Sequence, residues 1–164
     1  MSLRPRTALA LLVVAGAVLT GCSSDEGGQA VSEAPSTATT LPLGKVHDTG
    51  RMQVTVPPPR PVTTSARAKP QPNAPAFAVD VTLTNTGPEA FPVVGLFVKA
   101  EVAGAPAVEV YDDENGFSGG ITANDVPPGG RETISYGFSG AQPGPLVVSV
   151  DGVADVPVTF TGTL

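Results

Sequence analysis

Apolar and polar residues alternate along the second half of this chain, and that alternation is the feature that most limits how it can fold. The segment 76–85 reads AFAVDVTLTN, and its large apolar side chains are spaced two residues apart: Phe77, Val79, Val81 and Leu83. Because successive side chains of a β-strand point to opposite faces, this period of two predicts a strand with one buried face. The residues at 85–88, NTGP, are typical of the turn that ends it.

Apolar residues follow the same rule, or gather between turn residues, in six other short segments. These are 52–56, 93–102, 107–111, 132–139, 146–150 and 155–161. All eight aromatic residues lie between positions 77 and 160, which places the core there, and no helical period follows residue 21. About seven short strands separated by turns predict an all-β fold, an antiparallel β-sandwich with Greek-key connections.

The first 22 residues have the pattern of an export signal. Two arginines and no acid precede an apolar run of 13 residues at 7–19. A membrane-spanning helix needs roughly 20 apolar residues, so this run has the length of a signal-peptide core. The run ends in Leu19-Thr20-Gly21-Cys22, which resembles the lipobox of bacterial prolipoproteins. That resemblance implies removal of residues 1–21 and acylation of Cys22, palmitate included, which would anchor the protein on the extracytoplasmic face of the cell membrane.

Cys22 is the only cysteine, so the chain cannot form an internal disulfide. Acylation would remove the free thiol and stabilise membrane attachment by about 0.8 kcal/mol per buried methylene. Without residues 1–21, the chain has seven basic and fifteen acidic residues, which gives a formal charge of −8. This acidic balance argues against nucleic acid and anionic lipid as partners.

Residues 22–43 are expected to form a tether. They are rich in Ser, Thr, Gly, Ala and Pro and contain no aromatic residue. Such a composition cannot bury enough apolar area to offset the entropy of ordering, so it predicts a disordered coil that spans roughly 25 Å. The folded domain is expected at 44–162, with an exposed proline-rich loop over 57–75 that carries Arg67 and Lys69.

A series of short motifs in this domain is similar to a known family. In chain order they are VDVTLTNTG at 79–87, VYD at 110–112, GFSG at 116–119, PGG at 128–130, YGF at 136–138 and FTG at 160–162. Together they resemble the immunoglobulin-like domain of unknown function found in secreted proteins and lipoproteins of actinobacteria and other Gram-positive bacteria. The resemblance implies an immunoglobulin-like β-sandwich and brings no catalytic residues with it.

Ser118 stands in a G-x-S-x-G pattern of the kind that presents a nucleophile in hydrolases. A working serine needs a base that accepts its proton and an acid that orients that base. The only histidine is His47, and nothing around it resembles a catalytic loop. The sequence therefore predicts a protein that is not an enzyme, and it indicates no cofactor.

Two groups of residues have the chemistry of metal ligands. Asp112 and Asp113, with Asp125 in the next loop, could supply hard oxygen ligands for calcium, although the EF-hand spacing is absent. The DDENG run at 112–116 is equally typical of a tight charged turn, which is the favoured interpretation. His47 and Met52 are softer ligands suited to copper. A calcium or copper carrier of the cell envelope therefore stays open as the alternative function.

The favoured function is non-catalytic binding or adhesion, because β-sandwiches commonly bind through their end loops or a sheet edge. The candidate surface is the acidic turn at 111–116 with the loop at 117–124. Its residues are Tyr111, Asp112, Asp113, Glu114, Asn115 and Phe117. The expected partners are another envelope protein, a cell-wall polymer or a host molecule.

Overall fold

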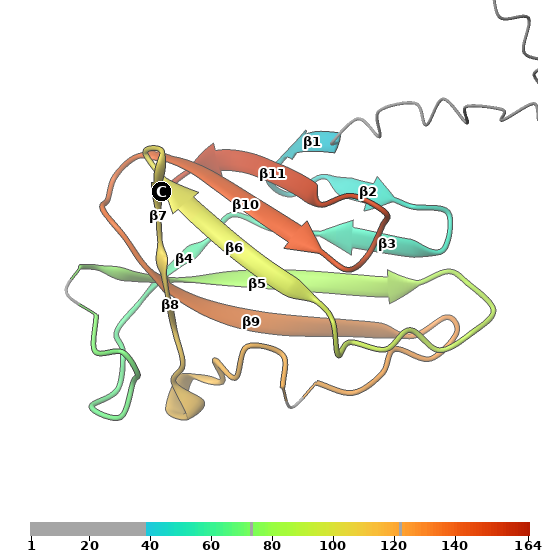
Figure 1. Ribbon diagram of the computed structural model, residues 1–164, viewed down its shortest axis with the longest axis horizontal. Coiled ribbons are helices and arrows are strands. Elements are labelled where there is room, and N and C mark those ends of the chain that lie inside the picture. The colour runs from blue at the N-terminus through green and yellow to red at the C-terminus, as the bar shows by residue number, and fades with distance from the viewer. Residues whose placement is uncertain (1–38, 73, 122) are drawn as a thin grey trace, which may run out of the picture. The chain divides into compact units, whose positions relative to one another are not determined.

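The computed structural model describes residues 39–72, 74–121 and 123–164, which fold into two β-sheets (Figure 1). Sheet A has the strand order β1-β11-β10-β6-β7, and sheet B has the order β2-β3-β5-β9-β8, with β4 also paired to β5. The bounds are β1 Thr39–Pro42, β2 Val46–Asp48, β3 Met52–Thr55, β4 Arg60–Val62, β5 Ala76–Asn85, β6 Phe97–Val102, β7 Ala105–Pro106, β8 Val108–Val110, β9 Arg131–Ser139, β10 Pro145–Asp151 and β11 Val158–Thr163. The described residues include no helix that is long and apolar enough to span a membrane.

The strand order is that of an immunoglobulin-like sandwich. In sheet B, β3, β5, β9 and β8 lie in the order of immunoglobulin strands A, B, E and D, and in sheet A, β11, β10 and β6 lie in the order G, F and C. The prediction of an immunoglobulin-like β-sandwich is therefore confirmed. One pairing departs from the antiparallel expectation, because β1 runs parallel to β11.

The main core lies between the two sheets. The four apolar side chains that alternate along β5 are at most 1% exposed, as their spacing predicted: Phe77, Val79, Val81 and Leu83. Across the ladder, Phe138 of β9 stacks on Phe77 with ring centroids 5.9 Å apart. Fully burying such a side chain contributes about 1.5–3 kcal/mol, so this cluster is the main source of stability.

The predicted strand bounds agree best with the structure where the alternation of apolar and polar residues is longest. β5 has the predicted bounds, and β3, β9 and β10 agree within one residue at each end. β6 begins only at Phe97, because Val94 and Gly95 form a turn in which Val94 is 87% exposed. The last strand likewise begins at Val158 rather than at residue 155.

The chain crosses from one sheet to the other at Ala107. β7 pairs with β6 in sheet A, and β8, which starts one residue later, pairs with β9 in sheet B. The predicted turn at 103–106 is therefore partly strand. This crossing closes one side of the sandwich (Figure 1).

The sandwich also begins earlier than the sequence indicated. β1 pairs with β11, and the backbone N–H of Leu43 donates to the carbonyl of Thr161 at 2.9 Å. Leu41 and Leu43 pack against the core, so residues 39–43 belong to the domain and not to the tether. Two leucines among threonines and prolines are too few to set a period. The expected signal peptide, Cys22 and residues 23–38 lie outside the described residues.

The proline-rich segment 57–75 is not the single exposed loop that we expected. β4 pairs with β5 beyond the end of β3, and the prolines at 57–59 interrupt the ladder between them because proline has no N–H to donate. Further along, Ala68 is 2% exposed. The rest of the segment, described at 63–72 and 74–75, leads into the start of β5, and we call it loop 63–75.

β5 defines the two ends of the sandwich. It starts at Ala76, next to loop 63–75, and we call this the Tyr111 end because Tyr111 pairs with Lys69 of that loop. It finishes at Asn85, which gives the Asn85 end its name. Thr39 lies opposite Val158 of β11, Val158 lies opposite Val150 of β10, and Val150 lies opposite Val98 of β6. β6 is the strand that follows the loop after Asn85, so this part of sheet A is at the Asn85 end. The chain therefore enters the sandwich at that end.

Candidate functional site

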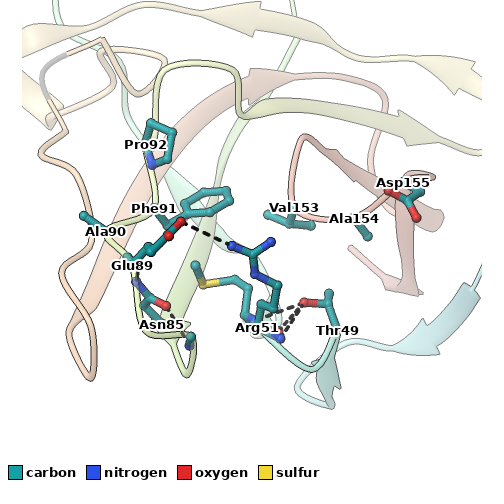
Figure 2. A pocket seen from close by; sticks show the side chains of 12 residues that line it. Thr49, Arg51, Asn85, Glu89, Ala90, Phe91, Pro92, Val153, Ala154 and Asp155 are labelled. Carbon is teal, nitrogen blue, oxygen red and sulfur yellow. Dashed lines mark hydrogen bonds and ion pairs between the residues drawn. The ribbon is translucent and has the colours of Figure 1, made fainter.

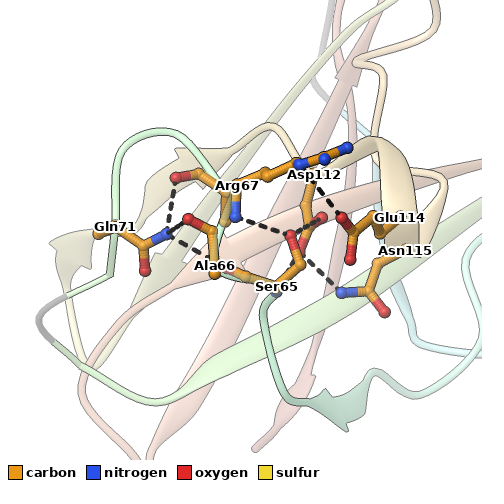
Figure 3. Close-up of polar contacts among 8 residues, drawn as sticks. Ser65, Ala66, Arg67, Gln71, Asp112, Glu114 and Asn115 are labelled. Carbon is orange, nitrogen blue, oxygen red and sulfur yellow. Dashed lines mark hydrogen bonds and ion pairs between the residues drawn. The ribbon is translucent and has the colours of Figure 1, made fainter.

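A buried carboxylate joins two loops at the Tyr111 end (Figure 3). Asp112 is 1% exposed and accepts hydrogen bonds from the backbone N–H and the hydroxyl of Ser65, both at 2.7 Å. The side-chain amide of Asn115 donates to the same carboxylate at 2.7 Å. These bonds fasten loop 63–75 to the turn after β8. Asp112 therefore positions the loops, and it does not form part of an exposed surface as the sequence suggested.

The charge of Asp112 is stabilised by these donors. Burial acts to raise the pKa of Asp112, because it disfavours the charged form, but the hydrogen bonds from Ser65 and Asn115 outweigh it. The pKa of Asp112 therefore lies below its ordinary value. The carboxylate stays ionised, and its hydrogen bonds are the stronger, charge-assisted kind.

The acidic run folds as the tight turn that the sequence favoured. Asp113–Asn115 is a single turn of 3-10 helix, η1, and Gly116 after it has φ 75°, a conformation in which glycine carries no steric cost. On either side of the turn, Asp112 and Phe117 exchange two backbone hydrogen bonds of 3.0 Å each. Asp113, Glu114 and Asn115 are exposed.

Phe117 is buried at 1% exposure, so it lies beneath the surface and not on it, contrary to the prediction. Its ring covers Gly137 of β9, where an added Cβ would come 2.5 Å from Phe117 Cδ2. Ala78, which pairs with Gly137, is buried too, as are Ala68 and Val110, and none of these residues belongs to the main core. They form a second small core that supports the loops on the outer face of sheet B.

A cavity of about 710 Å³ opens beside this turn, and we call it the Tyr111 pocket. One wall comes from loop 63–75 and the other from the residues after β8. The lining residues are Ala66, Arg67, Ala68, Lys69, Gln71, Tyr111, Asp113 and Glu114. Tyr111 is 45% exposed.

Backbone contacts hold the two walls of the pocket in place. Lys69 and Tyr111 exchange two backbone hydrogen bonds of 2.8 Å each. The side-chain amide of Gln71 donates to the carbonyls of Ser65, Ala66 and Ala68 at 3.0–3.2 Å, which closes the loop on itself (Figure 3). The pocket is therefore formed before any ligand binds, which lowers the entropic cost of binding.

The pocket combines an aromatic side chain with charges of both signs. Arg67 and Lys69 supply two cations, and Asp113 and Glu114 supply two carboxylates, with the Arg67 Nε atom 3.6 Å from Glu114 Oε1. Burial, with the carboxylate of Glu109 nearby, raises the pKa of Tyr111, so its phenol stays a hydrogen-bond donor at neutral pH. A cavity of this size lies within the range of small-ligand sites.

Three of the six residues that the sequence predicted as a binding surface line this pocket: Tyr111, Asp113 and Glu114. That they bind a ligand stays a prediction. The contribution of Arg67 and Lys69 was missed, because these basic residues stand more than 40 positions from the turn that they face. The only sign in the sequence that Arg67 and Lys69 act together was their position in one proline-rich segment.

The metal hypotheses gain no support from the geometry. Within the described ranges, no group of three or more His, Cys, Asp or Glu side chains is arranged to hold a metal ion. The carboxylate of Asp112 is occupied by donors, and Asp125 is exposed in a separate loop. Met52 is buried in the core at 1% exposure, whereas His47 lies in the edge strand β2.

Ser118 and His47 lie at opposite edges of sheet B. Ser118 follows β8, the strand at one edge, and His47 is in β2 at the other. These two residues therefore do not form a nucleophile and base pair. That the protein is not an enzyme stays a prediction.

Solved structures match this fold, although no protein-family model and none of the curated proteins match the chain. MPT63, a secreted protein of Mycobacterium tuberculosis, is 16% identical with a TM-score of 0.55, over 79% of this chain and 99% of its own. YcdA, a candidate lipoprotein of Bacillus subtilis, is 12% identical with a TM-score of 0.55. The match covers 72% of this chain but only 38% of YcdA. Likeness at such low identity shows the β-sandwich fold.

Proposed function

We propose that this protein is an extracytoplasmic lipoprotein, anchored through Cys22, whose sandwich binds a component of the cell envelope at the Tyr111 pocket. The pocket is the observation that carries the proposal, because it offers an exposed aromatic side chain and charges of both signs on loops that are already fastened. The N-terminal pattern that ends in Cys22 supports the anchor. The fold shared with a secreted protein and a candidate lipoprotein agrees with that location.

The position of the pocket fits a partner away from the membrane. The chain enters the sandwich at Thr39, at the Asn85 end, and the Tyr111 pocket is at the other end of β5. A domain held from its N-terminus would therefore have this pocket on the side opposite its attachment. A cell-wall polymer or another envelope protein is the partner that such an arrangement suits.

The anchor is tested by comparing the full-length protein with its Cys22→Ala variant in a Gram-positive host. The cells are fed an alkyne analogue of palmitate, and membrane and medium fractions are examined for protein and label. We expect the palmitate label on the unaltered protein, in the membrane fraction, and no label on the variant. Label on the Cys22→Ala variant, or none on the unaltered protein, would disprove the anchor.

The pocket is tested separately by crosslinking in live cells and mass spectrometry of the captured partner. Tyr111→Ala is expected to lower capture about ten-fold or more, because truncating an aromatic contact at the centre of a site costs more than 1.4 kcal/mol. Phe97→Ala is the matched control, since Phe97 is an aromatic side chain exposed by 63% on β6. Equal capture by both variants would remove the Tyr111 pocket from the proposal.

A further inference from the structure

A second cavity, of about 600 Å³, lies at the Asn85 end (Figure 2). Its walls come from three separate parts of the chain: the turn between β2 and β3, the loop after β5 and the loop between β10 and β11. We call it the Arg51 cavity, because the Arg51 side chain extends into it between Glu89 and Val153 (Figure 2).

Asn85 fastens one wall of this cavity from within. It is 2% exposed, and its side-chain amide donates to the carbonyls of Glu89 at 2.7 Å and Val126 at 2.8 Å. Its side-chain oxygen accepts the N–H of Gly87 at 2.9 Å. The loop after β5 is thus tied both to itself and to the segment that leads into β9.

Backbone bonds connect the loop after β5 to two of its neighbours. The N–H groups of Thr86 and Gly87 donate to the carbonyl of Arg51 at 3.1 and 3.0 Å, which joins the loop to the β2–β3 turn. Phe91 and Val126 exchange two bonds of 2.9 Å each. The backbone of these two walls is therefore held in place, and a ligand would not have to order it.

The side chains that face the cavity are free to change partners. Arg51 Nη2 lies 3.8 Å from Glu89 Oε2, and the two side chains are 76% and 81% exposed. An ion pair so long and so exposed contributes little to stability. Asp155, also exposed, adds a second carboxylate, and Phe91, Val153 and Ala154 supply the apolar part of the lining.

We infer that the Arg51 cavity is a binding site for a short zwitterionic peptide. Its carboxylate would pair with the guanidinium of Arg51, which suits planar bidentate recognition. Its ammonium group would lie against Glu89 and Asp155, and an apolar side chain would cover Phe91 and Val153. This assignment does not depend on the Tyr111 pocket.

Charge complementarity selects this class of ligand over simpler ones. A plain anion would meet the two carboxylates, and a plain cation would meet Arg51. An uncharged apolar ligand would displace water from three charged groups without replacing their hydrogen bonds. A molecule with both charges and an apolar side chain satisfies the whole lining.

The test is a titration of the isotope-labelled processed chain, residues 22–164 with Cys22→Ala, with the dipeptide alanyl-leucine, followed by NMR. Concentrations up to about 10 mM would saturate a site with a Kd of about 1 mM. We expect saturable shifts at the amides of Arg51, Phe91 and Val153. The N-acetylated and the C-amidated dipeptides should each bind about ten-fold more weakly, since each lacks one charge-assisted contact.

Variants then assign the contacts. Arg51→Gln is expected to weaken alanyl-leucine binding about ten-fold, whereas Arg131→Gln should leave it unchanged, because Arg131 is exposed at the same end but does not line the cavity. Both variants should keep the melting temperature of the parent. Shifts that do not saturate, equal binding of the capped dipeptides, or unchanged binding by Arg51→Gln would each overturn the inference.

Discussion

At each end of β5, one buried polar side chain fastens a loop to the sandwich. Asp112 is 1% exposed at the Tyr111 end and Asn85 is 2% exposed at the other. Each makes three side-chain hydrogen bonds to its loop or turn. The difference between them is charge, because Asp112 is an ionised carboxylate and Asn85 is a neutral amide. Charge-assisted bonds are the stronger kind, so the Tyr111 end is expected to depend more on its fastening residue and to respond to pH.

The two ends also differ in how their loops pack. At the Tyr111 end, Phe117 is 1% exposed and covers Gly137 in a core of its own. At the Asn85 end, Phe91 is half-buried and packs against the edge of the main core. The loops of the Tyr111 pocket therefore rest on a separate apolar support, whereas those of the Arg51 cavity share the support of the whole sandwich.

The largest effect is expected for Phe117→Ala. Removing this ring takes away buried apolar contact and leaves a cavity over Gly137, which should lower the free energy of unfolding by about 3–5 kcal/mol. Phe91→Ala, the counterpart at the Asn85 end, should cost less because its side chain is only half-buried. Urea unfolding of both variants measures the two values. Equal losses in the free energy of unfolding for the two variants would contradict a separate apolar core beneath the loops of the Tyr111 end.

The next largest losses in the free energy of unfolding are expected when the fastening side chains, Asp112 and Asn85, are removed. Asp112→Ala leaves the part-buried donors of Ser65 and Asn115 without their charged acceptor, at a cost of about 3 kcal/mol. Asn85→Ala takes the amide donor from the carbonyl of Glu89 and removes the bonds to Gly87 and Val126, which keep backbone partners, at a cost of about 2 kcal/mol. Both are measured by urea unfolding at pH 7, with Ser65→Ala as a milder control. A larger loss in Asn85→Ala would reverse the comparison.

The sequence predicted the sheets well and the ends poorly, for a physical reason. Alternation is a local signal, so the ten residues of β5 were predicted with the correct bounds. β1 and β4 were missed, because strands of four and three residues that contain proline carry almost no period and are held by neighbours distant in the chain.

The same limit applies to the candidate site. The composition of the DDENG run predicted the turn, but nothing local indicated that Asp112 would be buried by Ser65, 47 positions away. Phe117 was assigned to the surface because an isolated aromatic in a Gly-rich run gives no sign of burial. Its burial requires Gly137 on β9, where the missing side chain makes room for the ring. Contacts of this kind arise only once the sheets have assembled.

Because Asp112 is charged and Asn85 is neutral, their contributions to stability should differ in their dependence on pH. The pKa of Asp112 is lowered in the folded state from its ordinary value of 3.8, so folding favours the ionised form. Its contribution is therefore complete above that pH and is lost as the pH falls through the lowered folded pKa. Urea midpoints of the parent protein and of Asp112→Asn are compared from pH 7 down to pH 3.

We expect the gap between these two proteins to narrow below about pH 4, because protonation gives the parent the neutral side chain that the variant already has. Asp48, whose pKa is lowered by hydrogen bonds from Gln53 and Gly50, is present in both and cancels in the difference. The gap between the parent and Asn85→Ala should stay constant over the same range. A gap that narrowed for Asn85→Ala instead would show that charge is not what distinguishes the ends.

The smallest effects on stability are expected where the two ends are most alike, in their exposed ion pairs. Arg51 with Glu89 and Arg67 with Glu114 are separated by 3.8 and 3.6 Å, and all four side chains are more than half exposed. Arg51→Gln and Arg67→Gln should each change the free energy of unfolding by less than about 0.5 kcal/mol, because water already solvates these charges. Urea unfolding of the two single variants and of the double variant measures this, and the double variant should show additive values because the sites are far apart.

If that result is obtained, neither Arg51 nor Arg67 is needed for the stability of the fold. Each stands on a backbone that buried groups have already fastened, with a charge that its own ion pair barely uses. A loss above about 1 kcal/mol in either variant would instead mean that the ion pair holds its loop, which exceeds what exposed pairs usually contribute. The charge at that end would then be structural, and the case for a ligand there would rest on the remaining lining alone.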